Sequence, residues 1–225
     1  MSFFVLEGLD GSGKSTQFEL LLKVLKSRPV GAREVKFPDY ASPSSALVKM
    51  YLNGEFGSDP QAVNAYAAST FYAVDRFASF QKNWKADFDR GITILADRYT
   101  TSNYIYQMGK LPEDKWEEYL SWVEDLEYCR LGLPRPDQVI FLDMPVEVSQ
   151  HLLSQRYRGD EEKKDIHESH LEFLRNCAKC AEFAAQRLGW TVISCAKDGV
   201  PLPIEEIHRE VLQAIENQSV KGDLS

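Results

Sequence analysis

The sequence predicts an α/β domain in which helices cover both faces of a five-stranded parallel sheet. Five short apolar runs have the character of buried strands, and they lie at residues 3–6, 32–37, 92–96, 139–142 and 190–193. Segments with the apolar spacing of helices separate these runs, and strands that alternate with helices are typical of parallel sheets. A length of 225 residues is enough for one such domain with a full hydrophobic core.

The segments between and after the strands are predicted to be helical. They lie at residues 17–26, 43–52, 60–90, 112–126, 146–157, 166–188 and 204–215. We therefore expect a single domain over residues 1–217 and a polar, disordered tail over residues 218–225.

The longest helical segment, residues 60–90, carries an apolar stripe that contains Tyr66, Phe77, Trp84 and Phe88. The stripe exceeds what packing on one face of a sheet requires. We therefore expect the 60–90 region to contact a second copy of the chain in a homodimer.

Composition and charge limit the classes of partner. The chain is 44% apolar and 27% charged, which is ordinary for a globular protein, and no apolar run approaches the ~20 residues that span a membrane. The net charge of −8 argues against a broad nucleic-acid surface. No signal-peptide pattern is visible at the N-terminus. We expect a cytoplasmic protein whose partners include neither a nucleic acid nor a membrane.

The strongest functional signal lies directly after the first strand. The motif G-x-x-x-x-G-K-[ST] sits here between a strand and a helix, which is the context that it requires. Glycines let a phosphate approach the backbone N–H groups at the helix start, Lys14 can reach the β- and γ-phosphates, and the Ser15 hydroxyl can ligate Mg²⁺. The sequence therefore predicts an ATP site formed by Gly8, Leu9, Asp10, Gly11, Ser12, Gly13, Lys14, Ser15 and Thr16.

Other strand ends predict an acceptor site beside this motif, since parallel sheets bind ligands beyond the carboxyl ends of their strands. Phe37-Pro38-Asp39 and Asp97-Arg98 follow two further strands. On the long helical segment, Tyr72 and Arg76 are four residues apart and share a face. This pair suits a base that stacks on the ring and bonds to the guanidinium.

A charged segment at about residues 154–168 is predicted to be a mobile lid. Arg156 and Arg158 flank Tyr157 at the end of a helix, and an apolar-poor stretch follows. Few buried contacts imply low local stability, which a closing lid needs. Arginines on such a lid could supply charge to a transferring phosphoryl group.

Six blocks, in order, resemble the thymidylate kinase family of P-loop enzymes, which phosphorylate dTMP with ATP. The blocks are residues 8–16, Phe37-Pro38-Asp39-Tyr40, Tyr72-Ala73-Val74-Asp75-Arg76, residues 97–107, residues 132–137 and Asp165-Ile166-His167-Glu168. The resemblance extends from end to end of the chain. It implies the three-layer α/β/α fold of P-loop NTPases, Mg²⁺ as cofactor, ATP and dTMP as partners, and a homodimer.

The resemblance also implies roles for individual residues. In catalysis these are Asp10, Lys14, Arg98, Arg156 and Arg158. In dTMP binding they are Phe37, Pro38, Tyr40, Tyr72, Arg76, Arg98, Ser102, Asn103, Tyr106, Asp165 and Glu168. By this resemblance, Tyr72 stacks on thymine, Arg76 bonds to the base and Arg98 holds the 5′-phosphate. Phe37-Pro38 forms the wall near the thymine methyl group, and Tyr106 lies under the deoxyribose.

The chain departs from part of the family pattern at the P-loop. Some members have an arginine in this loop, where Gly11 and Ser12 stand here. The resemblance is then to the bacterial-type arrangement, in which lid arginines such as Arg156 and Arg158 supply the missing charge. Some members also have an arginine shortly after Phe-Pro, where this chain has Tyr40.

Three other functions remain open at this point. A deoxynucleoside kinase that acts on thymidine would need a carboxylate base, and Asp39 is a candidate for it. Another nucleoside monophosphate kinase is the second alternative. A GTP-binding switch is more distant, because the sequence lacks the Asn-Lys-x-Asp motif of guanine recognition.

Overall fold

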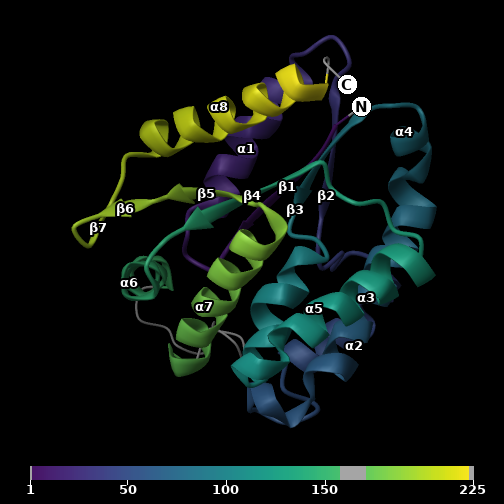
Figure 1. Ribbon diagram of the computed structural model, residues 1–225, viewed down its shortest axis with the longest axis vertical. Coiled ribbons are helices and arrows are strands. Elements are labelled where there is room, and N and C mark those ends of the chain that lie inside the picture. The colour runs from purple at the N-terminus through teal and green to yellow at the C-terminus, as the bar shows by residue number, and fades with distance from the viewer. Residues whose placement is uncertain (1, 158–170, 223–225) are drawn as a thin grey trace.

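The computed structural model describes residues 2–157 and 171–222, with side chains for residues 2–155 and 171–217. Its centre is one parallel sheet in the spatial order β2-β3-β1-β4-β5 (Figure 1). The strands are β1 (Phe3–Gly8), β2 (Ala32–Lys36), β3 (Thr93–Asp97), β4 (Gln138–Asp143) and β5 (Thr191–Ser194). The predicted fold class, with five parallel strands, is confirmed.

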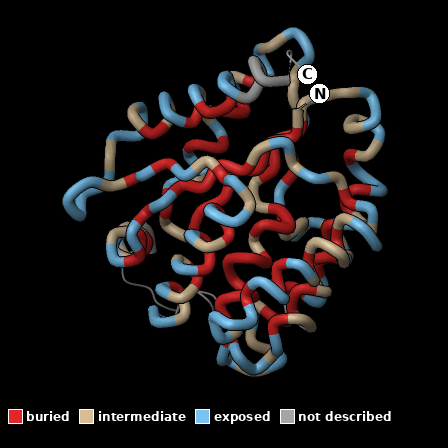
Figure 2. The backbone as a smooth tube through the Cα atoms, viewed as in Figure 1, coloured by how far each residue is buried: buried red, intermediate tan, exposed pale blue. Residues whose placement is uncertain are grey.

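Two layers of helices bury the two faces of the sheet, because successive side chains of a strand point to opposite faces. On one face, Phe4 and Leu6 of β1 pack with α1 (Lys14–Lys26) and α8 (Ile204–Gly222). On the other face, Phe3 and Val5 pack with helices of the second layer, which are α3 (Ala65–Ser79), α5 (Trp116–Glu124) and α7 (Leu171–Leu188). Figure 2 shows the buried residues gathered along the strands and the inner sides of these helices.

The segment predicted as one helix over residues 60–90 is a series of shorter elements. A 3-10 turn (Pro60–Ala62) precedes α3, and the side chain of Asn64 caps the N-terminus of α3. A π turn (Phe80–Trp84) then leads into α4 (Lys85–Asp89). A π turn is wider than an α turn and shifts the helical register. The continuous helix was therefore a wrong prediction, although the segment is helical for most of its length.

Most of the predicted apolar stripe belongs to the core. The side chain of Trp84 is 1% exposed, and its ring packs edge-on against Phe3 with the centroids 5.6 Å apart. Tyr66 and Phe88 pack against the same core cluster. Phe77 is the exception at 37% exposed. The apolar surface that this segment leaves for a second copy is smaller than the stripe suggested.

The other helices lie mainly in the predicted segments. They are α2 (Ala46–Leu52), α6 (Val146–Tyr157) and short 3-10 turns at Pro43–Ser45 and Glu113–Lys115. A π turn (Asp125–Arg130) continues α5 beyond its predicted end. A π turn (Asn103–Gln107) and a 3-10 turn (Met108–Lys110) form a helical stretch that the prediction left out. None of the described helices is both long and apolar enough to span a membrane.

The C-terminal part differs from the prediction in two places. A short antiparallel hairpin, β6 (Ala196–Lys197) with β7 (Val200–Pro201), follows β5. Asp198 and Gly199 form its turn with positive φ angles, and Asp-Gly is a hairpin signal. Helix α8 continues to Gly222, so residues 218–222, which were expected in a disordered tail, are helical. No glycine or proline interrupts residues 205–221.

We expect Trp84→Ala to lower the free energy of unfolding by about 3–5 kcal/mol, because it leaves a large cavity among aromatic rings. The control is Val30→Ala, which truncates a side chain that is 59% exposed between α1 and β2 and should change that free energy by about 0.5 kcal/mol or less. Urea unfolding at one pH measures both. A Trp84→Ala loss no larger than the Val30→Ala loss would contradict the core assignment.

Candidate active site

The loop between β1 and α1 forms a cradle whose backbone faces one cavity. The cavity is lined by residues 9–16 and by Leu153 of α6. Gly11 and Gly13 have φ angles of 83° and 82°, which glycine adopts without strain. Gly13 also lies at the N-terminus of α1, where backbone N–H groups lack partners within the helix. The cradle can therefore donate to an anion, as the motif predicts.

Glycine at position 11 is required by a close approach of α6. A Cβ atom on Gly11 would lie 2.5 Å from the carbonyl oxygen of Ser149 and 3.0 Å from Cγ of Leu153. No arginine could therefore stand at this position without displacing α6. The departure from the family pattern at residue 11 has a steric cause in this chain.

Lys14 and Asp97 form a close ion pair between the cradle and the end of β3. Burial is the main cause that lowers the pKa of Lys14, and the charge of Arg98 lowers it further, against the opposing effect of Asp97. In these buried surroundings, a second anionic partner such as a phosphate stabilises the charged form of a lysine. Asp97 also lies one residue before Arg98, and the sequence predicted its place at the strand end but no role of its own.

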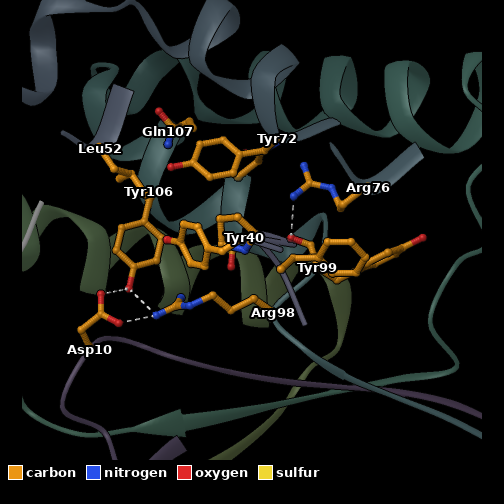
Figure 3. A pocket seen from close by; sticks show the side chains of 13 residues that line it. Asp10, Tyr40, Leu52, Tyr72, Arg76, Arg98, Tyr99, Tyr106 and Gln107 are labelled. Atoms are coloured by element: carbon orange, nitrogen blue, oxygen red, sulfur yellow. Dashed lines mark hydrogen bonds and ion pairs between the residues drawn. The ribbon is translucent and has the colours of Figure 1, made fainter. Parts of the chain in front are cut away.

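Every predicted substrate residue whose side chain the structure describes lines one pocket beside the cradle (Figure 3). These residues are Phe37, Pro38, Tyr40, Tyr72, Arg76, Arg98, Ser102, Asn103 and Tyr106. Asp10 lines the same pocket, so the cradle and the pocket share a wall. Leu52, Tyr99 and Gln107 also line it, and they are not among the predicted site residues. Asp165 and Glu168 lie outside the described residues.

Arg98 is held on the floor of this pocket by anionic and aromatic groups. Its Nη2 donates to Asp10 Oδ1 at 2.6 Å and to the Tyr106 hydroxyl at 3.1 Å, and Tyr106 donates to Asp10 Oδ2 at 3.0 Å (Figure 3). Burial lowers the pKa of Arg98, but the interactions with Tyr106 and with the carboxylates of Asp10, Glu7 and Asp97 outweigh burial and raise it well above its usual value. Arg98 therefore stays charged, and Asp10 links it to the cradle.

The backbone of Arg98 is itself in an uncommon conformation. Its φ angle is 65°, in the left-handed region that non-glycine residues seldom occupy. Its amide donates to the carbonyl oxygen of Leu6 at 3.1 Å, which fixes the turn after β3. A strained backbone conformation of this kind persists only where surrounding contacts hold it, and strained residues cluster at functional sites.

Glu7 is a fully buried carboxylate that the sequence analysis missed. Its Oε1 accepts from the hydroxyls of Thr101 at 2.6 Å and Ser102 at 2.7 Å, and its Oε2 lies 3.6 Å from Nη1 of Arg98. Ser102 therefore lines the pocket with its hydroxyl already directed to Glu7. The signal that could have revealed Glu7 is an acidic residue at the end of the apolar run 3–6.

Arg76 lines the pocket, but its surroundings differ from the exposed helix edge that the sequence suggested. The side chain is buried, and its Nε and Nη2 donate to the two carboxylate oxygens of Glu127, each at 2.6 Å. Its Nη1 donates to the carbonyl oxygen of Tyr99 at 3.2 Å (Figure 3). Burial lowers the pKa of Arg76, and Glu127 more than offsets it, so the pKa is raised.

The turn after β2 is fastened to α3 by Asp75. The Phe37–Pro38 peptide is cis, and the next amide, of Asp39, donates to Asp75 Oδ2 at 2.8 Å. Asp39 itself accepts from Asn83 Nδ2 at 3.3 Å and does not line the pocket. These contacts turn Phe37 and Pro38 toward the pocket and direct the Asp39 carboxylate elsewhere.

The predicted lid is only partly within the described residues. Arg158 lies outside them, and for Arg156 the backbone alone is described, at the end of α6. Arg156 follows Ser149 by seven residues, which is about two helical turns, so both belong to the same face of α6. That is the face whose Ser149 carbonyl approaches Gly11.

We expect Gly11→Ala to lower kcat/KM for ATP by about 10²-fold, because it displaces the cradle or α6 by an ångström or more. The control is Gly91→Ala, which places a Cβ at a similar φ of 79° but meets nothing within 4 Å. Steady-state kinetics with ATP as the varied substrate compares the two variants. Equal, small losses would show that the approach of α6 does not constrain the cradle.

Comparisons with known proteins show which family this chain resembles. The family model described as "Thymidylate kinase" matches residues 6–211. The thymidylate kinase of Mycobacterium tuberculosis H37Rv is 32% identical over 202 residues, which cover 86% of this chain and 91% of that protein. The thymidylate kinase of Schizosaccharomyces pombe is 27% identical over 224 residues, which cover 98% and 94%. A solved structure of thymidylate kinase from Candida albicans matches the fold with a TM-score of 0.69, at 21% identity over 97% of this chain and 92% of that one. The chain belongs to the thymidylate kinase family.

Proposed function

We propose that this protein transfers the γ-phosphoryl group of ATP to dTMP, which gives ADP and dTDP. One observation carries the proposal. Arg98, on the floor of the acceptor pocket, is bonded at 2.6 Å to Asp10 of the ATP cradle. A monophosphate held by Arg98 therefore lies beside the terminal phosphate of a nucleotide in the cradle. Phosphoryl transfer is mainly positioning and charge stabilisation, and this arrangement supplies both.

On the donor side, Lys14 and the loop amides bind the β- and γ-phosphates. Mg²⁺ usually takes one or two protein oxygens and several oxygens of phosphate and water. The Ser15 hydroxyl and the Asp97 carboxylate are oxygens of this kind, and Asp97 contacts the neighbouring Lys14, so the residues fit the ion. When bound with ATP, Mg²⁺ neutralises charge that develops on the phosphates.

A second cavity beside the cradle is suited to the base of ATP. It is bounded by α1, α6 and the segment after the β6–β7 hairpin, and its lining is mainly apolar. Its apolar lining residues include Met144, Leu152, Leu153, Leu202, Ile204 and Ile207. An apolar cavity next to a phosphate cradle is suited to a purine ring.

On the acceptor side, the base of dTMP lies against Tyr72, whose ring is packed edge-on against Tyr51 with centroids 6.4 Å apart. Arg76 and Asn103 bond to the base edge. Phe37 and Pro38 form the wall at the thymine methyl group. The phosphate end of the nucleotide reaches Arg98, and Tyr106 packs under the sugar. In Figure 3, Tyr72 and Arg76 lie on the opposite side of the pocket from Asp10 and Arg98.

The structure favours a monophosphate over thymidine as the acceptor. A hydroxyl acceptor calls for a free carboxylate base. Asp39 is directed to Asn83, and Asp10 is engaged by Arg98 and Tyr106. A monophosphate is already ionised and calls for a cation instead, which Arg98 provides.

A panel of acceptors tests the function. With ATP and Mg²⁺, we expect the highest kcat/KM with dTMP among dTMP, dUMP, dCMP, AMP and thymidine. Arg98→Ala should lower turnover of dTMP by more than about 10²-fold, and this loss would exclude a contaminating kinase as the source of the activity. The surface change Arg90→Ala should leave the turnover unchanged. Faster turnover of thymidine than of dTMP would overturn the proposal.

A bacterial-type reaction with lid arginines belongs to the same proposal. Its support is that Gly11 cannot be replaced by an arginine and that Arg156 belongs to the α6 face that meets the loop. We expect at least one of the variants Arg156→Ala and Arg158→Ala to lower kcat by about 10²- to 10⁴-fold. The control is Arg175→Ala, an exposed arginine that pairs with Glu147 at 3.0 Å. Near-wild-type kcat in both lid variants would contradict this part.

We also propose a homodimer formed through the 60–90 region. Its support is that Val74 and Phe77, 53% and 37% exposed, lie three residues apart on α3 and share a face. Light scattering at micromolar concentration should give the mass of two chains, and Val74→Glu with Phe77→Glu should give the mass of one. A single-chain mass for the unaltered protein would refute the dimer.

The cytoplasmic location remains a prediction from the sequence.

A further inference from the structure

Glu127 lies behind the acceptor pocket and contacts two of the residues that line it. It belongs to the π turn Asp125–Arg130 after α5 and is 0% exposed. Its two oxygens accept from Nε and Nη2 of Arg76 at 2.6 Å each. Its Oε1 also accepts from Nδ2 of Asn103 at 2.8 Å. One carboxylate therefore orients both side chains that face the proposed base.

The chemistry of Glu127 determines which atoms remain for a ligand. An ionised carboxylate only accepts hydrogen bonds, so the amide of Asn103 must direct its NH₂ group to Glu127. Among the described residues, no hydrogen bond engages Oδ1 of Asn103. Within the part of the chain that the structure describes, Arg76 also retains N–H groups without an acceptor, because Nη1 has two hydrogens and donates one to the carbonyl oxygen of Tyr99. The pocket thus offers a donor from Arg76 and an acceptor from Asn103.

We propose that Glu127 is a positioning residue that sets the base specificity of the acceptor site. A donor beside an acceptor matches the edge of thymine or uracil, which has the O4 acceptor next to the N3–H donor. It opposes the edge of cytosine, which has a donor at N4 and an acceptor at N3. This inference rests on the proposed function, since it concerns the acceptor nucleotide of the same site.

The burial of Glu127 supports this role. Removing an ion pair from water is costly, and a buried pair often stabilises a fold no better than apolar residues of the same volume. A gain in stability alone therefore does not account well for the pair of Arg76 and Glu127. A site that forms hydrogen bonds with the correct ligand, and whose own polar groups stay unpaired when the wrong ligand binds, can discriminate strongly between the two ligands.

The test compares acceptors rather than overall activity. In Glu127→Gln the side-chain amide can donate as well as accept, so Asn103 is free to turn over and offer its NH₂ to the base. We expect the ratio of kcat/KM for dTMP to that for dCMP to fall by about 10- to 100-fold. The ratio for dTMP to dUMP should stay unchanged, because uracil and thymine share this edge. The matched control is Glu124→Gln in α5, which removes the carboxylate that pairs with Arg135 at 2.6 Å and should alter neither ratio.

Two further variants separate positioning from general damage. Glu127→Asp keeps an acceptor-only carboxylate, so it should lower kcat/KM for both nucleotides and preserve their ratio. Asn103→Ala removes the acceptor but keeps the pair of Arg76 and Glu127, so the ratio should fall even if Glu127→Gln does not fold. A dTMP-to-dCMP ratio that is unchanged in Glu127→Gln or, where that variant is unfolded, in Asn103→Ala would overturn the inference. Absence of dTMP turnover in the unaltered protein would instead refute the proposed function.

Discussion

The ion pair between Asp10 and Arg98 is the contact on which the rest of the site depends. Asp10 belongs to the cradle after β1, and Arg98 follows β3, the strand that pairs with β1. The register of two parallel strands therefore sets the distance between the donor and acceptor sites. Because β1 is central and its side chains are buried on both faces, this register cannot slip without disrupting the packing on both sides of the sheet.

The same site shows how an acidic protein binds anions. The net charge is −8, yet buried cations line both halves of the site. Each is paired with a carboxylate, since an isolated buried cation would destabilise the fold. Arg98 has Asp10 and Glu7, Arg76 has Glu127, and Lys14 has Asp97. The positive charge is therefore local, and the surface need not be basic.

The sequence predicted the parts of this structure that local patterns determine. The five strands, the cradle and the pocket residues at strand ends follow from apolar runs, the motif and the geometry of parallel sheets. Two of the carboxylates that hold the cations, Glu7 and Glu127, were missed, because their partners are distant in the chain: Glu127 is 51 residues from Arg76. The π turns were missed for a similar reason, since tertiary packing of rings such as Trp84 decides the register where an amphipathic pattern is continuous.

The carboxylates of the site differ in whether a bound phosphate would change their contacts. Glu7 and Glu127 are fully buried and also accept from hydroxyl or amide groups, so they stay in place and act as fixed supports. Asp97 pairs with Lys14 at the rim of the cradle. On the proposed function, Lys14 would contact the phosphates of ATP, and the Asp97 carboxylate would be one of the oxygens that hold the accompanying Mg²⁺. Lys14 and Asp97, the groups proposed for the phosphates and for the metal, are thus already in contact with each other between the cradle and the end of β3.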